Sequence, residues 1–328
     1  MQLTVMLTGS QLAAEIAAPL VARLDTPTLQ RMLERGRKSE ESFSPRGMGA
    51  EDWLAHNVFG DGATAPYAWA DLTGQRETEQ TIWHADPIHL GIGRESVIIG
   101  SLAEDPLSDA EADALIAAAN ESLGDAARLS RVGASWFLHA REAWQLEPLP
   151  PLAAALGRPF ATRGSLSDDE LHWNRLHNAV QMTWHAHPVN ESREADSRPT
   201  AGGLWLHGGG KWKPRPKLPW PALHSDRPEL RGAAASAGAE ARVASAPVTQ
   251  DALLVWDEAA GPQRQQDWQA WLAAMCVLDR RLAALPPASL TLVLAGDTGT
   301  CTWKTHATDR LRFWRSHRLE MALREPTS

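Results

Sequence analysis

Apolar runs and helical stripes alternate along the chain, and they predict an α/β protein. Residues Leu3–Leu7 form a short apolar run that ends at a Thr-Gly-Ser turn, which is typical of a strand followed by a helix. Residues Ala252–Trp256 and Leu290–Ala295 are continuous apolar runs, as expected of buried parallel strands. Between them, apolar positions from Trp268 to Leu282 recur at helical spacing. This succession predicts a βαβ unit, and such units bind ligands beyond the carboxyl ends of their strands.

The middle of the chain carries further strand and helix signals. Residues Thr81–Leu90, Ser96–Ile99 and Ala134–Ala140 resemble strands. Ser108 and Ser167 each stand three residues before a glutamate, a capping box that predicts the beginning of a helix. The glycine-rich motifs of nucleotide-binding proteins and the serine elbow of hydrolases do not occur in the sequence.

Composition excludes several classes of protein. The chain has 328 residues, a length typical of about two domains, and a formal net charge of −8. This charge argues against sequence-independent binding of nucleic acid, which depends on neutralising phosphates. Two cysteines exclude a disulfide framework, and no apolar run approaches the roughly 20 residues that span a membrane. The N-terminus has no signal-peptide pattern, so we expect a cytoplasmic protein that binds neither membrane nor nucleic acid.

Histidines supply a first group of candidate ligands. His84, Asp86 and His89 lie close together, with His84 and Asp86 on one face of a strand and His89 on the other. His185 and His187 form a His-x-His pair. These residues are candidate ligands of a zinc site, although no spacing forces three of them to converge. The alternative is that they hydrogen-bond to backbone near turns.

Acids at strand ends supply a second group. Asp257 follows one predicted strand and Asp297 the next, with His306 a short distance downstream. Carboxylates and an imidazole at adjacent strand ends would suit Mn²⁺ or Zn²⁺. Aspartates after strands also cap the next helix or turn, and spacing alone leaves the two interpretations even.

A third candidate is an anion site. It combines the tract from His187 through Asn190 to Arg193 with His207 and the glycines Gly208–Gly210. Arg193 could bind a phosphate or carboxylate, with glycine amides as further donors. In the alternative interpretation, the proline after His187 ends a helix, Asn190 forms a turn and Arg193 is a solvated surface charge.

The same tracts resemble known families. The segment HPVNESREADSRPTAGGLWLHGGG is similar to the segment that archaeal-type cofactor-independent phosphoglycerate mutases carry after their inserted domain. The pieces LQRMLERGR, Ala85–Leu90, His187–Asn190 and Arg312–Arg315 resemble, over nearly the whole chain, a bacterial group of RpfE-type regulatory proteins. The resemblance implies an alkaline phosphatase-like α/β fold, with a mostly parallel sheet flanked by helices. It places the core in residues 1–80 and 161–328, and a smaller inserted α+β domain in residues 81–160.

Several positions depart from the mutase pattern. Where the mutases carry a metal-binding aspartate after the first strand, this chain has Leu7 or Thr8. The expected position of the nucleophilic serine is occupied by Glu51, although Ser42 and Ser44 lie nearby. The partner histidines of the two later aspartates are missing as well. Asp257, Asp297 and His306 alone remain of the implied two-metal site.

These departures predict a catalytically degenerate phosphoglycerate mutase-like protein with a regulatory, ligand-sensing or protein-interaction role, and therefore not an enzyme. Without a nucleophile no phosphoserine intermediate forms, and without half the ligands no two-metal clamp forms. The expected partner is a small phosphorylated or carboxylated metabolite or a regulatory protein. The alternatives are an active metal-dependent phosphomutase or phosphatase acting on small phosphorylated metabolites, and a metalloprotein built on the histidines. Mn²⁺ and Zn²⁺ are the candidate cofactors.

Overall fold

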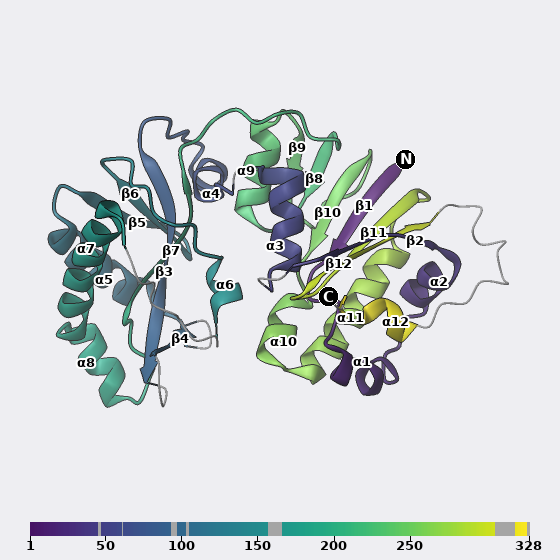
Figure 1. The fold of residues 1–328 in the computed structure, drawn as a ribbon, viewed down its shortest axis with the longest axis horizontal. Helices are drawn as coiled ribbons and strands as arrows, with labels where there is room; N and C mark the ends of the chain where they lie inside the picture. Colours follow the sequence, from purple (N-terminus) through teal and green to yellow (C-terminus); the bar gives the residue numbers. More distant parts are fainter. Residues whose placement is uncertain are drawn as a thin grey trace. The chain divides into compact units, whose positions relative to one another are not determined.

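The computed structural model describes residues 1–44, 47–60, 62–92, 97–102, 105–156, 166–305 and 319–326. The chain forms two compact units. The first consists of residues 1–61 and 214–328, and the second of residues 62–213. Each unit has its own sheet and its own hydrophobic core (Figure 1).

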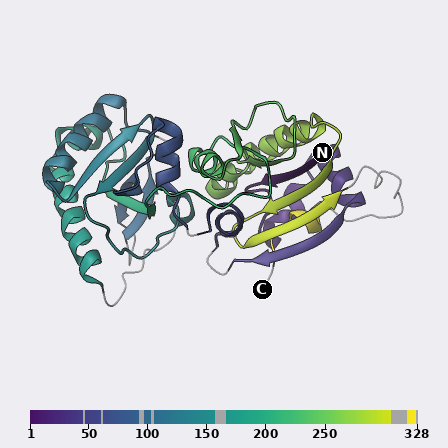
Figure 2. The same ribbon diagram turned by 90° about the horizontal axis from the view of Figure 1, so that it is seen from above.

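The first unit is built on a seven-stranded mixed sheet. Its strands, from edge to edge, are β2 (Arg37–Phe43), β12 (Gly299–Thr305), β11 (Ser289–Ala295), β1 (Gln2–Leu7), β10 (Ala252–Trp256), β8 (Ala222–His224) and β9 (Glu240–Arg242). The central strand β1 runs parallel to both β10 and β11, whereas β12 and β2 are antiparallel and lie side by side at one edge (Figure 2). The predicted strands are confirmed. However, β10 and β11 are not adjacent, as the strand-end site had assumed, because β1 lies between them.

Four helices contribute to the main core of this unit. They are α1 (Ala14–Val21), α2 (Pro27–Arg35), α11 (Trp268–Ala283) and α12 (Leu319–Leu323). The predicted apolar stripe lies on α11 and packs against alternate residues of β1. Trp271 of this stripe is fully buried, and its indole nitrogen donates to the carbonyl oxygen of Gly9 at 2.8 Å. The described part of the unit also contains α3 (Gly49–Leu54), the π-helical turn η1 (Ala55–Phe59), α9 (Pro228–Ser236) and α10 (Ala260–Gln265).

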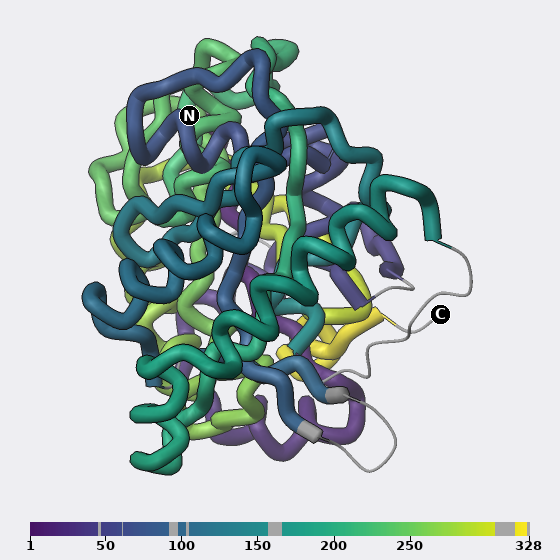
Figure 3. The backbone as a smooth tube through the Cα atoms, turned by 90° about the vertical axis from the view of Figure 1, so that its left-hand side faces the viewer, coloured from purple at the N-terminus to yellow at the C-terminus, as the bar shows by residue number. Residues whose placement is uncertain are grey.

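The second unit contains an antiparallel sheet. Its strands run in the order β4 (Val97–Ser101), β3 (Thr81–Ile92), β6 (Ser135–Ala140) and β5 (Ala127–Val132), and β7 (Gly203–Gly210) also pairs with β3. Helices α5 (Asp109–Leu123) and α7 (Asp168–His185) lie side by side and share one core with the sheet (Figures 1 and 3). Both predicted capping boxes are formed, by Ser108 for α5 and Ser167 for α7. The shorter helices are α4 (Ala65–Thr73), α6 (Leu152–Ala155) and α8 (Pro188–Ala195).

The α/β class is confirmed, as one mixed sheet and one antiparallel sheet with helices. The compact units divide the chain differently from the predicted boundaries at 81 and 160. Helices α7 and α8 and strand β7 belong to the second unit, because β7 pairs with β3 and α7 packs in the same core. His306 and Arg312–Arg315 lie outside the described residues. Among the described residues, no helix has both the length and the apolar character needed to cross a membrane.

Candidate functional site at the carboxyl edge of the first sheet

Four neighbouring parallel strands of the first unit end at the same edge, and each is followed by a polar residue. In spatial order the strands are β8, β10, β1 and β11. The residues that follow them are Arg227, three positions beyond β8, then Asp257, Thr8 and Asp297. The carboxyl edge of a parallel sheet is where ligands bind in such folds, so this edge is the natural place to look for a site.

Thr8, in the middle of the edge, is bonded to its neighbour. Its hydroxyl donates to Asp257 Oδ1 at 2.7 Å, and its backbone N–H donates to the Trp256 carbonyl oxygen at 3.1 Å. Burial raises the pKa of Asp257, against the opposing effects of Arg227 and the Thr8 hydroxyl, while Glu51 and Glu229 raise it further. The carboxylate of Asp257 is therefore held in a crowded, acid-rich environment.

Arg227 is a cation at this edge that contacts several carboxylates. Its Nη1 and Nη2 donate to the two carboxylate oxygens of Glu51, each at 3.0 Å, and its Nε donates to Glu229 at 2.7 Å. Burial disfavours the charged guanidinium, but the carboxylates of Glu51, Glu229 and Asp257 outweigh that effect and hold the pKa of Arg227 well above its usual value. The pair with Glu51 has the two-point geometry that makes arginine–carboxylate contacts strong.

Local structure explains how these side chains converge. Pro228 occupies the first turn of α9, which places Arg227 in extended backbone just before the helix and Glu229 just inside it. Glu51 lies in the first turn of α3. That helix is held at the edge by Gly49, whose N–H donates to the Asp297 carbonyl oxygen at 2.9 Å. A side chain at Gly49 would clash with Gly299, because an added Cβ would lie 2.4 Å from its carbonyl oxygen.

The serines near Glu51 do not take the place of a nucleophile. Ser44 is buried, and its hydroxyl donates to Asp52 at 2.6 Å while accepting from the backbone N–H of Met48. Ser42 lies in the exposed edge strand β2, paired with Thr300. Glu51 is thus the side chain that the structure presents at this position, and its carboxylate is engaged with Arg227.

The two strand-end aspartates lie on either side of β1. Asp257 belongs to the cluster with Thr8, Arg227 and Glu51, whereas Asp297 follows β11, one strand beyond β1. The Asp297 N–H donates to Glu325 at 2.6 Å, and burial raises the pKa of that glutamate. Within the described ranges, no three histidine, cysteine, aspartate or glutamate side chains are placed to hold a metal ion. The described side chains do not fit the implied two-metal centre, because no three candidate ligands converge there and Asp257 faces the guanidinium of Arg227.

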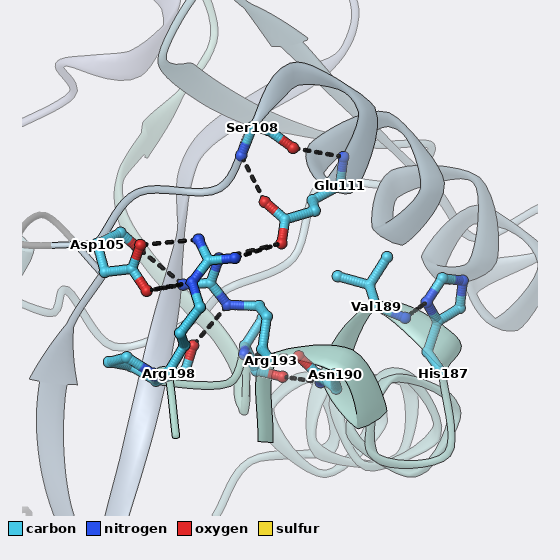
Figure 4. A network of polar contacts seen from close by, with 10 residues as sticks. Asp105, Ser108, Glu111, His187, Val189, Asn190, Arg193 and Arg198 are labelled. Atoms are coloured by element: carbon cyan, nitrogen blue, oxygen red, sulfur yellow. Dashed lines mark hydrogen bonds and ion pairs between the residues drawn. The ribbon is translucent and has the colours of Figure 1, made fainter. Parts of the chain in front are cut away.

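The predicted anion site at His187, Asn190 and Arg193 is an internal brace of the second unit (Figure 4). Arg193 is fully buried and donates to Glu111, to Asp105 and to the Pro199 carbonyl oxygen. Asn190 joins α8 to the following loop by bonding to Trp184 and Ala201, and His187 caps α8 through the N–H of Val189.

The alternative interpretation of Arg193 as a solvated surface charge was wrong, because its side chain is fully buried. Pro188 begins α8 rather than ending a helix, and Asn190 ties together separate segments. Arg193 is neither a surface charge nor turned toward a ligand, since its donors serve Asp105, Glu111 and Pro199. The order of residues that suggested an anion site reflects the packing of α8 against α5.

The glycines Gly208–Gly210 form part of β7 rather than a free anion-binding loop. An added Cβ at Gly209 would lie 2.2 Å from the ring of Trp83, and one at Gly210 would lie 2.7 Å from Ala63. Gly208 has a positive φ of 59°, and its carbonyl oxygen accepts from the N–H of Thr64. These glycines allow close packing, so the predicted donor role is not supported by their position.

The predicted histidine groups are only partly brought together. His84 stacks on His207 with ring centroids 4.7 Å apart, and His207 Nε2 lies 2.9 Å from Asp86 Oδ2. His89 instead lies 3.0 Å from the Thr200 carbonyl oxygen, and His185 is exposed in the last turn of α7. The pairing of His84 and Asp86 on one face was predicted, but the contribution of His207 was not.

Sequence reasoning missed Arg227, Glu229 and the bond from Thr8 to Asp257. Arg227 stands in a Ser-Asp-Arg-Pro-Glu stretch that matches no motif. The available signal was its position shortly after a short apolar run that ends at His224. A separate cavity of about 320 Å³, lined by Thr4, Trp220, Thr291 and their neighbours, involves the amino ends of β1 and β11 and so lies away from this cluster.

Comparison with known proteins bears on the fold alone. Neither a family model nor a curated protein matches the sequence. Among solved structures, the PH0037 protein from Pyrococcus horikoshii is 14% identical with a TM-score of 0.54, over 97% of this chain and 91% of that chain. This chain shares the fold of PH0037. A cofactor-independent phosphoglycerate mutase from Thermoplasma acidophilum DSM 1728 is also 14% identical, over 98% of this chain and 94% of that chain, but its TM-score of 0.42 does not establish a common fold.

Proposed function

We propose that this chain is a catalytically degenerate, phosphoglycerate mutase-like protein that acts by binding a metabolite or a protein partner rather than by phosphoryl transfer. The proposal includes an alkaline phosphatase-like core, an inserted α+β domain, a place in the RpfE-type regulatory group and a cytoplasmic location. The sequence resemblance supports the scaffold. The single observation that carries the loss of catalysis is the bidentate ion pair between Glu51 and Arg227.

The chemistry of that pair is opposed to phosphoryl transfer. Metal-dependent phosphomutases need a serine hydroxyl whose pKa is lowered by adjacent metal ions, and further cationic groups on the transferring phosphoryl group. Glu51 places a carboxylate at the position expected for the nucleophile, and both terminal nitrogens of the Arg227 guanidinium donate to that carboxylate. Thr8, bonded to Asp257, stands where the resemblance places an aspartate ligand.

A second candidate function is an active metal-dependent phosphomutase or phosphatase. It is favoured by one observation, namely that Asp257 and Asp297 both lie at the carboxyl edge and flank the end of β1. In this alternative, Mn²⁺ or Zn²⁺ would be held by these aspartates and by His306.

One set of assays separates the two functions. The full chain is incubated with Mn²⁺ or Zn²⁺ and either 3-phosphoglycerate or p-nitrophenyl phosphate, beside the Asp297→Ala variant as a matched control. The proposed function predicts rates equal to the metal-only background for both proteins. Turnover by the wild type that disappears in Asp297→Ala would establish the enzyme instead.

A further inference from the structure

We propose that the cavity at the amino ends of β1 and β11 binds a small organic anion, namely a single carboxylate or phosphate group attached to a ring or another flat apolar body. This site goes beyond the proposed function, because it lies away from the carboxyl edge and binds its ligand whether or not that edge catalyses a reaction. The cavity volume of about 320 Å³ falls within the range of small-molecule sites.

The cavity lies over a polar row on one face of the first sheet. Thr4, Thr291 and Lys304 line it and are paired neighbours on β1, β11 and β12, so their side chains share this face. The residue before each of them belongs to the main core on the opposite face. Further along the polar face, Met6 and Val293 are buried. The change from buried apolar to polar side chains therefore marks where the covered part of this face ends and the cavity begins.

Lys304 and Thr291 supply the donors for an anionic group. Lys304 is exposed, and among the described residues neither side chain has a hydrogen-bond or ion-pair partner. Because the two residues are directly paired across β11 and β12, an ammonium group and a hydroxyl can bind oxygen atoms of the same carboxylate or phosphate. The carboxyl edge differs in this respect, since the guanidinium of Arg227 there is already bonded to carboxylates of the chain itself.

Trp220 provides a flat apolar wall. Its indole nitrogen donates to Oγ1 of Thr4 at 3.0 Å, and its ring centroid lies 6.1 Å from that of Trp53 in α3. These two contacts hold the ring in place, so a ligand that packs against it loses less binding energy to side-chain ordering. Thr4 accepts the bond from Trp220 and keeps its own hydroxyl proton to donate. An aromatic or other flat apolar body beside the anionic group matches this wall.

Asp251 limits the charge of the ligand. It lines the cavity just before β10, three strand spacings, or about 14 Å, across the sheet from the strand of Lys304. Its Oδ1 accepts from the backbone N–H of Gln2 at 2.8 Å, which joins the beginnings of β1 and β10. The negative charge at this end repels a second anionic group. The ligand therefore carries one anionic group rather than one at each end.

The experiment is ¹⁹F NMR of the full-length chain labelled with 5-fluorotryptophan. The chain has 15 tryptophans, and the signal that is missing from Trp220→Phe identifies Trp220. Phenyl phosphate and benzoate are titrated separately to 10 mM at constant ionic strength. At least one of them should shift the Trp220 signal until it saturates, and the tighter of the two shows which anionic group the site prefers. Neutral benzamide, and terephthalate with its two opposed carboxylates, should each bind about ten-fold more weakly than the better probe.

Lys304→Met and Lys38→Met form a matched pair of variants. Lys38 lies on the neighbouring strand β2, opposite Trp303, and therefore on the other face of the sheet. It is 43% exposed and pairs with Glu41. Lys304→Met should weaken binding of the better probe about ten-fold, because the anionic group loses its counter-charge while the apolar stem of the side chain is retained. Lys38→Met should bind the probe as the wild type does.

Two results would overturn the proposal. One is a Trp220 signal that phenyl phosphate and benzoate shift no further than benzamide does. The other is binding of the better probe by Lys304→Met with the wild-type affinity. Neither result involves turnover, so failure of this site would leave the proposed function as it stands.

Discussion

The guanidinium of Arg227 contacts both carboxylate oxygens of Glu51 at 3.0 Å, although 176 positions separate the two residues in the chain. The contact joins the beginning of α3 to the residue that precedes α9, across the carboxyl edge of the sheet. It is therefore a tertiary ion pair rather than a local one, and its removal should affect the whole first unit.

Glu51→Gln is expected to destabilise the protein by about 2 kcal/mol, because it leaves a partly buried guanidinium with one fewer counter-charge. Urea denaturation measures the change. The exposed pair of Lys38 and Glu41 provides the control, since both side chains are more than 40% exposed. Glu41→Gln should change stability by no more than about 0.5 kcal/mol. Equal effects of the two substitutions would show that the Glu51 pair is no stronger than a surface pair.

Asp257→Asn is expected to raise the melting temperature at pH 7. The folded-state pKa of Asp257 lies above its unfolded value, so ionisation of this carboxyl disfavours the folded state as pH rises. The advantage of the variant should therefore be greatest at neutral pH and should disappear as pH falls toward the ordinary aspartate pKa of 3.8. A variant less stable than the wild type at pH 7 would show that attraction to Arg227 outweighs burial.

Arg193→Lys is expected to cost about 3 kcal/mol or more, because a buried arginine that bonds to two carboxylates and two carbonyl oxygens loses its planar guanidinium. Arg198, which pairs with the same acids but is 36% exposed, is the control, and Arg198→Lys should destabilise the protein far less, because solvent screens exposed ion pairs. Calorimetry with a phosphometabolite completes the test. A stable Arg193→Lys protein that has lost metabolite binding would restore the ligand role suggested by the sequence.

Gly209→Ala is expected to destabilise the second unit by about 2 kcal/mol, because the new methyl group would overlap the ring of Trp83. Gly91, in β3 of the same unit, is the control, because a Cβ added there would lie 3.7 Å from the Ile98 carbonyl oxygen, an ordinary van der Waals distance. Gly91→Ala should be neutral or stabilising by about 0.5 kcal/mol. Thermal unfolding compares the two variants, and equal melting temperatures would contradict the packing role of the glycine.

His177→Gln is expected to reduce acid sensitivity. Burial lowers the pKa of His177 to about 4, so the folded protein holds this imidazole neutral while the unfolded chain protonates it near 6.5. The stability contributed by the neutral ring is complete above pH 6.5 and is lost as pH falls toward 4, by up to about 3 kcal/mol. Glutamine keeps an acceptor for the N–H of Leu204, which bonds to His177 at 2.9 Å.

The control for this prediction is His185→Gln, since His185 is exposed in the last turn of α7. Its stability should follow the wild-type pH profile. Urea denaturation at pH 7, 5.5 and 4.5 measures all three proteins. Parallel profiles for wild type and His177→Gln would show that the His177 ring does not govern acid stability. The half-buried His139, whose pKa is also lowered to about 4, would then be the next candidate.

Elements with strong local signals were predicted correctly from the sequence. The stripe on α11 and the boxes at Ser108 and Ser167 depend on residues three or four positions apart, so the sequence displays them directly. The strand Leu290–Ala295 was identified because a parallel strand buried on both faces is continuously apolar.

The arrangement of these elements was not predictable in the same way. The insertion of β1 between β10 and β11 is decided by packing across the whole sheet, and no local pattern records it. The burial of Arg193 depends on Asp105 and Glu111, which lie 88 and 82 positions away. Arg227 was not predicted for the same reason, because its partner Glu51 lies 176 positions away, in the other of the two chain segments that form the first unit.

Titration calorimetry of Mn²⁺ into the wild-type full-length chain tests most directly whether Arg227 prevents metal binding at the carboxyl edge. We predict no stoichiometric binding at micromolar metal concentration, because the guanidinium already holds the carboxylates of Glu51 and Glu229. Binding of one or two ions per chain, lost in both Asp257→Ala and Asp297→Ala, would contradict this account.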